Sequence, residues 1–170
     1  NAVLDGTDAV MLSGETTTGD YPIETVTFMA SIAADAESHS KNDFKFFGKI
    51  GRTECIAKGA VDLATYVDVK AIACASVSGF TAKFISNFRP NCPIMATCTD
   101  KDVARSLALN YGIYTSIVPV VHDTDEMIKL AKERTQEFFK LGNENKIIIT
   151  GGLPITGKSR LTNFIKIEET

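Results

Sequence analysis

The sequence predicts an α/β fold: a mostly parallel five-stranded sheet with helices on both faces and an antiparallel last strand. Short apolar runs alternate with helical patterns from residue 51 onward, which is typical of a parallel sheet with right-handed crossovers. The last two apolar runs have no helical pattern between them, so the final strand should run antiparallel. With 170 residues, the chain can bury a sizeable core but is too short for a whole (β/α)₈ barrel.

The elements of this α/β region follow from periodicity and from residues that begin or end helices. Strands are expected at residues 71–75, 94–97, 114–118, 146–150 and 161–167. A short helix is expected at 81–88, stopped before Arg89-Pro90. The expected boundaries of the other helices are Thr53 as an N-cap, Asp100 as the cap of a helix that continues through Leu109 to Gly112, and Asp123 or Thr124 as the start of a helix to Leu141.

Composition and charge exclude several classes of protein. A net charge of −3 argues against a general nucleic-acid binder, which needs a basic surface. No apolar run approaches the roughly 20 residues of a membrane span, and no signal-peptide pattern is visible, so a cytoplasmic protein is expected. The four cysteines are expected to be reduced thiols, with Cys55 and Cys74 as small core residues. His39 and His122 are expected at the surface.

The N-terminal segment, residues 5–24, has the pattern of a strand, a polar loop and a helix. The apolar run 9–12 indicates a strand covered on both faces. Ser13, Glu15 and Thr16 follow its C-terminal end, where ligands of α/β proteins bind, so they are candidates to line an active site. Asp20 is the expected cap of the next helix, with Pro22 in its first turn. A capped helix start without function is the alternative.

Three regions are expected along the chain. Residues 1–38 would form the N-terminal βα segment, with an apolar helical stripe over 23–39. Residues 39–51 are polar, contain a phenylalanine cluster and are predicted to be a linker. Residues 52–170 would form the α/β domain. Because Asn1 lies in the middle of a pattern, the chain is expected to be a piece of a longer protein.

Two loops of the α/β region are candidates for anion binding. In the first, the hydroxyls of Ser76, Ser78 and Thr81 together with Gly79 lie between a strand and a helix start. The second loop is rich in glycine and has two basic residues; its candidates are Gly157, Lys158, Ser159 and Arg160. The alternatives are a capped turn and a wide hairpin. The first loop lacks the spacing and lysine of a nucleotide P-loop.

Specific residues resemble the pyruvate kinase family. NAVLDG at 1–6, MLSGET at 11–16 and GDYP at 19–22, followed by Glu24, are similar to the last barrel strand, active-site loop and last helix of that family. The region from about Thr53 to Ile167 resembles its C-terminal domain. The matching features are the Ser-Gly-x-Thr loop, Arg89-Pro90-x-x-Pro93-Ile94, and a late Gly-x-Pro followed by Thr162-Asn163.

The resemblance implies a remnant of a (β/α)₈ barrel followed by an effector-binding domain. The parent enzyme would convert phosphoenolpyruvate and ADP to pyruvate and ATP in glycolysis, with Mg²⁺ and K⁺, as a tetramer. Because the family's metal carboxylates, catalytic lysine and potassium ligands come earlier in the barrel, this chain is expected to be inactive alone and to bind no metal. Without other barrel strands, residues 9–12 are expected to be poorly ordered or to pack differently, and 23–39 to remain a helix against the second domain.

The resemblance also implies a sugar-phosphate effector at the two loops. Ser76, Ser78, Gly79 and Thr81 would hold the phosphate, and Gly157 to Arg160 would close over it. Some members activated by fructose 1,6-bisphosphate have a basic residue in the first loop; this chain has Val77 and Phe80 there, and Lys158 and Arg160 are expected to compensate. The alternative function is a stand-alone phosphate- or nucleotide-binding α/β module.

Overall fold

The computed structural model describes residues 1–39, 51–76, 78–153 and 162–170. The chain divides into two compact units, Asn1–Asp43 and Phe44–Thr170, which are described separately below. The expected linker with its phenylalanine cluster falls almost entirely within residues 40–50 and thus outside the described residues.

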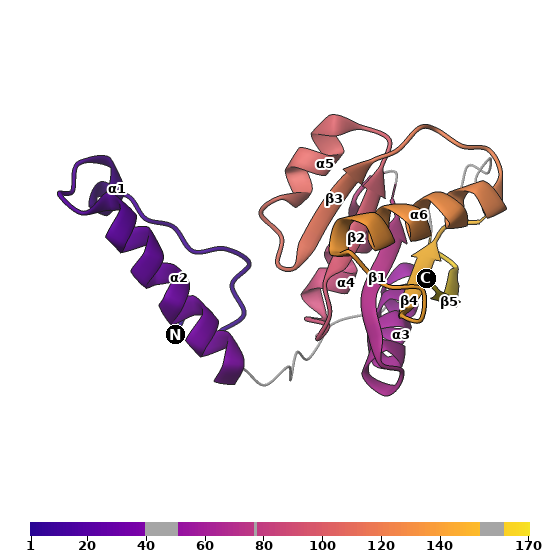
Figure 1. Ribbon diagram of the computed structural model, residues 1–170, viewed down its shortest axis with the longest axis horizontal. Helices are drawn as coiled ribbons and strands as arrows, with labels where there is room; N and C mark the ends of the chain where they lie inside the picture. Colours follow the sequence, from indigo (N-terminus) through magenta and orange to yellow (C-terminus); the bar gives the residue numbers. More distant parts are fainter. Residues whose placement is uncertain (40–50, 77, 154–161) are drawn as a thin grey trace. The chain divides into compact units, whose positions relative to one another are not determined.

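The second unit contains a five-stranded sheet in the order β3-β2-β1-β4-β5 (Figure 1). Its strands are β1 (Val69–Ala75), β2 (Ile94–Cys98), β3 (Ile113–Ile117), β4 (Lys146–Gly151) and β5 (Phe164–Glu169). The first four strands are parallel, and β5 pairs antiparallel with β4. The α/β fold class expected from the sequence is therefore confirmed, including the antiparallel last strand.

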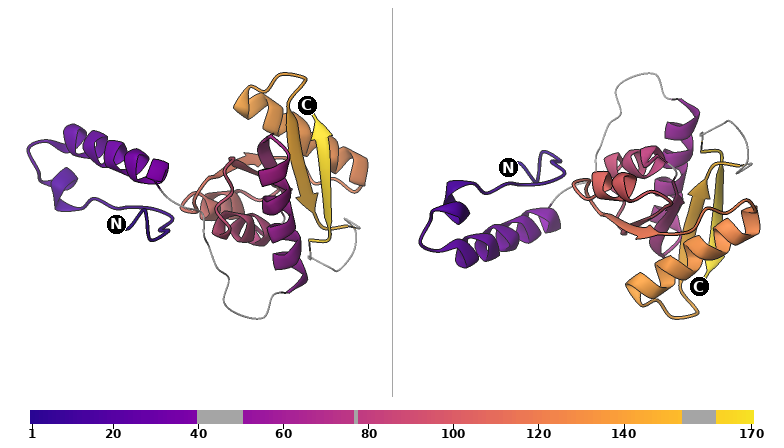
Figure 2. Two further views of the ribbon diagram at one scale, coloured as in Figure 1. Left: turned by 90° about the horizontal axis from the view of Figure 1, so that it is seen from below. Right: turned by 90° about the horizontal axis from the view of Figure 1, so that it is seen from above.

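Helices cover both faces of this sheet (Figure 1 and Figure 2). They are α3 (Arg52–Tyr66), α4 (Phe80–Asn87), α5 (Lys101–Leu107) and α6 (Thr124–Phe139). On one face, α3, α4 and α5 bury a large apolar cluster that includes Ile72 and Ile148. On the other face, α6 packs through Ala131 against Ile147 and Ile149. Successive residues of β4 thus point to opposite cores, which explains its uninterrupted apolar run.

Several helix boundaries differ from the expected ones. The carboxylate of Asp100 accepts hydrogen bonds from the amides of Asp102 and Val103, which confirms the expected cap. Helix α5 nevertheless ends at Leu107, so the helical assignment of Leu109, which is 74% exposed, was wrong. Gly51, not Thr53, precedes α3; Thr53 lies inside the helix and is buried.

The first unit contains α1 (Gly14–Thr17) and α2 (Pro22–His39), and its described residues form no strand. The apolar run 9–12 is therefore not a strand, as expected for this segment without the other barrel strands, because a strand needs a neighbour to take up its backbone hydrogen bonds. Met11 is 85% exposed, and no described residue of this unit is buried. The polar loop contains the single turn α1, and α2 begins at Pro22, so Tyr21 takes the position expected for Asp20. Packing of α2 against the second domain stays a prediction.

The cysteines are all free, as expected. Cys74 and Cys98 are buried in the sheet, whereas Cys55 is exposed on α3. The core position expected for Cys55 was therefore wrong: the buried face of α3 runs through Ala57, Ala60 and Val61 instead. His39 and His122 are exposed. Among the helices the structure describes, none is long and apolar enough to cross a membrane.

Candidate functional site

The strand order places a topological switch point at the carboxyl ends of β1 and β4. From β1 the chain proceeds through β2 to β3, then returns through α6 to β4 on the other side of β1. In open α/β sheets, ligands bind at such a point, where the strand order reverses. Ala75 and Gly151 lie side by side there: a Cβ added to Gly151 would be 3.4 Å from the Cβ of Ala75. The two loops predicted to bind an anion therefore leave the sheet from neighbouring strands.

Gly79 shapes the start of α4 in the first loop. It precedes the helix with a φ of 76°, a left-handed conformation that favours glycine. A Cβ at this position would also lie only 3.0 Å from the Cδ2 of Leu107. Both constraints explain why the Ser-Gly-x-Thr sequence has glycine here, and they fix the direction in which α4 leaves the switch point.

The first turn of α4 has no side-chain cap. The starts of α5 and α6 are capped by the carboxylates of Asp100 and Asp123, the latter accepting from the amide of Glu126 at 3.0 Å. Gly79 provides no side-chain hydrogen bond to α4, and its first turn contains no acidic residue. Uncapped amides at a helix start attract anions through hydrogen bonding and the helix dipole. The helix start at the switch point is thus chemically suited to a phosphate group, and the two Asp-capped starts are not.

The hydroxyls of the first loop are arranged in two directions. Ser78 is exposed, whereas Ser76 and Thr81 are only 6% exposed. Ser76 and Thr81 hydrogen-bond to the thiol of Cys74, which opposes the effect of its burial. Burial nevertheless raises the pKa of Cys74 to about 12, so the thiol stays protonated near neutral pH. Ser78 is therefore the hydroxyl of this group that faces solvent.

Thr162 joins the two loops, a contact that the sequence did not indicate. Its hydroxyl shares a short, buried hydrogen bond with the hydroxyl of Thr81. Next to it, Asn163 forms two hydrogen bonds with the backbone of Leu153, at 2.8 Å and 2.6 Å, and its amide donates to Gly151. The chain leaving β4 and the chain entering β5 are thus tied together at the base of the second loop. Thr81 and Thr162 are 81 positions apart, so only the fold brings them together.

The remaining effector candidates lie elsewhere. Gly157, Lys158, Ser159, Arg160 and Val77 fall outside the described residues. Phe80 is half exposed, and its ring packs edge-on against Phe84 at 4.6 Å. At one of the two first-loop positions considered for a basic residue, this chain thus presents an aromatic ring.

The active-site candidates of the first unit lie around α1. Glu15 accepts a hydrogen bond from the amide of Ser13 at 2.9 Å. Hydrogen bonds from its own amide and that of Ser13 hold the pKa of Glu15 below its ordinary value. Thr16 donates its hydroxyl to the carbonyl of Ser13 at 3.1 Å. These three residues therefore form a local turn, with the Glu15 carboxylate at the helix start, where it is electrostatically favoured.

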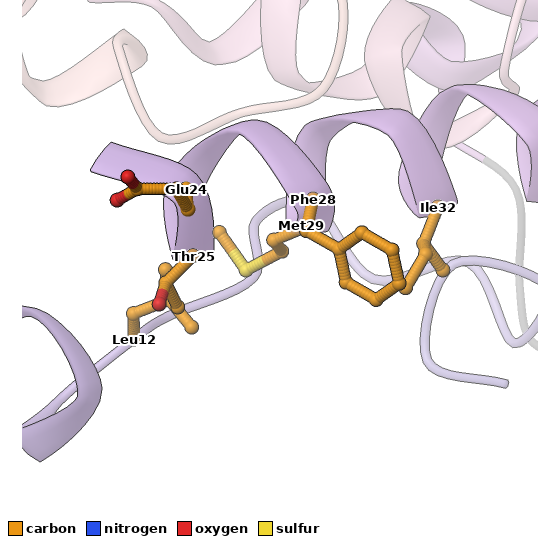
Figure 3. Close-up of a pocket in the computed structure, with 6 residues that line it drawn as sticks. All are labelled: Leu12, Glu24, Thr25, Phe28, Met29 and Ile32. Atoms are coloured by element: carbon orange, nitrogen blue, oxygen red, sulfur yellow. The ribbon is translucent and has the colours of Figure 1, made fainter. Parts of the chain in front are cut away.

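A groove of about 460 Å³ also lies in the first unit (Figure 3). Phe28, Met29 and Ile32 of α2 line it together with Leu12. Its polar lining residues are Glu24 and Thr25, and the hydroxyl of Thr25 donates to the carbonyl of Tyr21 at 2.7 Å. The groove is thus mostly apolar, with one carboxylate among its lining residues.

Metal binding is not supported within the part of the chain that the structure describes. No group of three His, Cys, Asp or Glu side chains there could hold a metal ion.

Two family models match the chain. The model described as the pyruvate kinase alpha/beta domain matches residues 54–168, and the pyruvate kinase barrel domain model matches residues 1–26. The first match covers β1 to β4, the switch point between β1 and β4, and all but the last residue of β5. The second covers α1 with Ser13, Glu15 and Thr16.

Individual relatives are pyruvate kinases. Those of Clostridium acetobutylicum and Borreliella burgdorferi are 36% and 37% identical over 99% and 98% of this chain. A pyruvate kinase structure from Cryptosporidium parvum matches 99% of the chain with a TM-score of 0.87 at 31% identity. A second structure from that organism, in complex with ADP, gives a TM-score of 0.82.

The chain spans only about a third of the length of these relatives: 36% of the two bacterial proteins and 34% of the first Cryptosporidium parvum structure. Within that third, the family model, the identity and the fold agree. The chain belongs to the pyruvate kinase family.

Proposed function

We propose that this chain is the C-terminal part of a pyruvate kinase that transfers a phosphoryl group from phosphoenolpyruvate to ADP. Residues 1–38 are the remnant of its catalytic barrel, 39–51 a linker and 52–170 its effector-binding domain. The order of the two family matches and the third of the relatives' length that the chain covers support this division. The whole enzyme would act in the cytoplasm as a homotetramer with Mg²⁺ and K⁺.

The α/β domain binds the phosphate of a sugar-phosphate effector in this proposal. Ser76, Ser78, Gly79 and Thr81 provide the first loop, and Gly157 to Arg160 the second. The observation that carries the proposal is the uncapped start of α4 at the switch point between β1 and β4. Backbone amides there can donate to phosphate oxygens, and the exposed hydroxyl of Ser78 lies next to them.

A thermal-shift titration with inorganic phosphate and with fructose 1,6-bisphosphate tests this binding. A ligand that binds only the folded state raises the melting temperature. Ser78→Asp should abolish the shift, because its negative charge repels the phosphate, whereas Ser106→Asp, at an exposed position on α5, should retain it. No stabilisation of the unsubstituted chain at millimolar ligand would contradict the proposal.

The chain by itself should lack kinase activity. Phosphoryl transfer depends on metal ions and basic groups around the moving phosphoryl group. Ser13, Glu15 and Thr16 would line only one side of such a site. ATP formation from phosphoenolpyruvate and ADP by the purified chain, measured by luminescence, would contradict this expectation.

The α/β domain also contributes to assembly in this proposal. Light scattering of the purified chain should give the mass of an oligomer. A strict monomer would mean that assembly requires parts of the protein beyond this chain.

A further inference from the structure

We propose that the outer edge of β3 pairs with the β3 of a second copy of this chain, antiparallel and with Thr115 opposite Thr115. β3 forms one edge of the sheet and β5 the other (Figure 1). The inference goes beyond the proposed function, because it concerns only the surface of the second unit and needs neither the effector site nor kinase activity.

The backbone of β3 binds β2 through every second residue. The carbonyl of Gly112 accepts a hydrogen bond from the amide of Ile94, and the amide of Val118 donates one to the carbonyl of Cys98, both at 2.9 Å. Backbone groups along a strand alternate between its two sides. The even-numbered residues of this stretch therefore face β2, and the odd-numbered residues face the open edge of the sheet.

The outward-facing backbone groups of β3 are available to another strand. They are the amides and carbonyls of Thr115 and Ile117 and the carbonyl of Ile113, since the amide of Ile113 donates to Asn110 at 3.4 Å. Among the residues of the second unit that the structure describes, none forms a backbone hydrogen bond with these groups. An edge strand with unpaired amides and carbonyls is a template for pairing with another chain.

The two edges of the sheet differ in charge. Proteins protect exposed edge strands from pairing with charged side chains, lysine in particular. β5 contains Lys166, which forms an ion pair with Glu168, and ends at Glu169. The sequence of β3, IYTSI, contains no charged residue, no proline and no glycine. Of the two edges, β3 is therefore the one without charges that oppose strand pairing.

A second copy fits this edge because the sequence of β3 is complementary to itself. In an antiparallel pair centred on Thr115, the backbone of this residue donates to and accepts from Thr115 of the second copy, and Ile113 lies opposite Ile117. Thr–Thr pairs across neighbouring strands are favourable, whereas like charges directly opposite each other are destabilising. No like charges meet within this pair, since β3 is uncharged.

Pairing also covers apolar surface at this edge. Ile117 is 44% exposed and Tyr114 45%, whereas Ile113 is buried in the cluster beneath α5. Ile117 would pack against Ile113 of the second copy, and Tyr114, whose ring contacts Phe138 of α6, would lie opposite Ser116 on the other face. Because a strand of five residues is small compared with a standard interface of about 800 Å² per partner, the association should be weak.

Sedimentation equilibrium of the 170-residue chain, from micromolar to near-millimolar concentration, measures the Kd of this association. Thr115→Lys places two ammonium groups opposite each other and should raise the Kd at least about tenfold; Thr115→Glu should do the same with two carboxylates. An equimolar mixture of the two variants should associate again, because each lysine then faces a glutamate. This recovery requires residue 115 to lie opposite itself and is therefore specific to the proposed register.

Two exposed positions provide the controls. Ile117→Lys puts a charge against Ile113 of the second copy and should raise the Kd roughly tenfold. Because Ile117 is 44% exposed, this variant should fold even where Thr115→Lys does not, which circular dichroism verifies. Ile167→Lys, at a 42% exposed position of β5, should leave the Kd within about twofold of the original value.

The outcomes separate this inference from the assembly expected of the α/β domain. An unsubstituted chain that stays monomeric at near-millimolar concentration would overturn the pairing of β3. Association weakened by Ile167→Lys but not by the β3 variants would also overturn it, and would leave assembly through β5 standing. If the mixture of Thr115→Lys and Thr115→Glu fails to associate, the register centred on Thr115 is wrong.

Discussion

The two units of this chain differ in whether they have an interior. Phe44–Thr170 buries two apolar clusters, one on each face of its sheet. Asn1–Asp43 has a longer helix than any in the second unit, yet α2 contains no buried residue. Ile23, Phe28 and Ile32 of α2 are 78%, 70% and 55% exposed. An apolar stripe on a helix therefore does not form a core by itself. It becomes buried only when another element packs against it.

The largest expected difference between the units is in amide hydrogen exchange. Amides of β1 and β4 should exchange only through global unfolding, whereas those of α2 should open locally. Because a tenfold change corresponds to about 1.4 kcal/mol and domains are stable by about 5–15 kcal/mol, exchange should differ by roughly a thousandfold or more. Mass spectrometry or NMR can measure this. Equal protection of α2 and β1 would show that α2 is covered in solution.

The second largest difference is expected when a single isoleucine is shortened to alanine in each unit. Ile72→Ala, at a fully buried position of β1, should lower the free energy of unfolding by about 2–5 kcal/mol. Ile32→Ala, at an exposed position of α2, should change it by less than about 0.5 kcal/mol. Denaturant unfolding followed by circular dichroism measures both. A similar loss in the two variants would mean that α2 belongs to the same cooperative unit as the sheet.

Alkaline pH should weaken the second unit through its buried thiols. Burial raises the pKa of Cys74 from about 9 to about 12, so its folded form retains a proton that the unfolded chain releases. This contribution is present below about pH 9 and is lost as the pH rises toward 12, with a slope of up to about 1.4 kcal/mol per pH unit.

The matched variants for this prediction are Cys74→Ala and Cys55→Ala. Cys74→Ala should flatten the decline of the unfolding free energy between pH 9 and 11, whereas Cys55→Ala, at an exposed position, should leave it unchanged. An unchanged slope in Cys74→Ala would assign the decline to other groups.

The smallest expected effect on stability comes from removing the side chain that caps a helix. Asp123→Ala removes the carboxylate that accepts from the amide of Glu126, and should cost about 1 kcal/mol. Asp20→Ala should have no measurable effect on unfolding, because α2 begins only at Pro22. Thermal denaturation of the two variants provides the comparison. A substantial loss in Asp20→Ala would mean that this side chain makes a contact in solution beyond the helix start.

Much of the second unit was predictable because its signals are local. The cap of α5 by Asp100 follows from an acidic residue just before a helical pattern, and the antiparallel β5 follows from the missing crossover helix. The position of Cys55 was not predictable: residues two positions apart lie on nearly opposite faces of a helix, as exposed Cys55 and buried Ala57 show. The apolar run 9–12 has the local pattern of a strand but does not form one, as expected without the other barrel strands, since strand pairing requires a second strand that local sequence cannot supply.

The features of the candidate site likewise fall into two groups, those that the sequence determined and those that only the tertiary structure decided. The sequence alone identified the family, the loop of Ser76 to Thr81 and the glycine that its turn requires, because these are properties of consecutive residues. The tertiary structure alone decided that β1 lies beside β4, that Ser76 and Thr81 point inward while Ser78 faces solvent, and that Thr162 reaches Thr81. Those features depend on the order in which strands pair and on which surfaces the helices cover, and both are set by the burial of residues far apart in the chain.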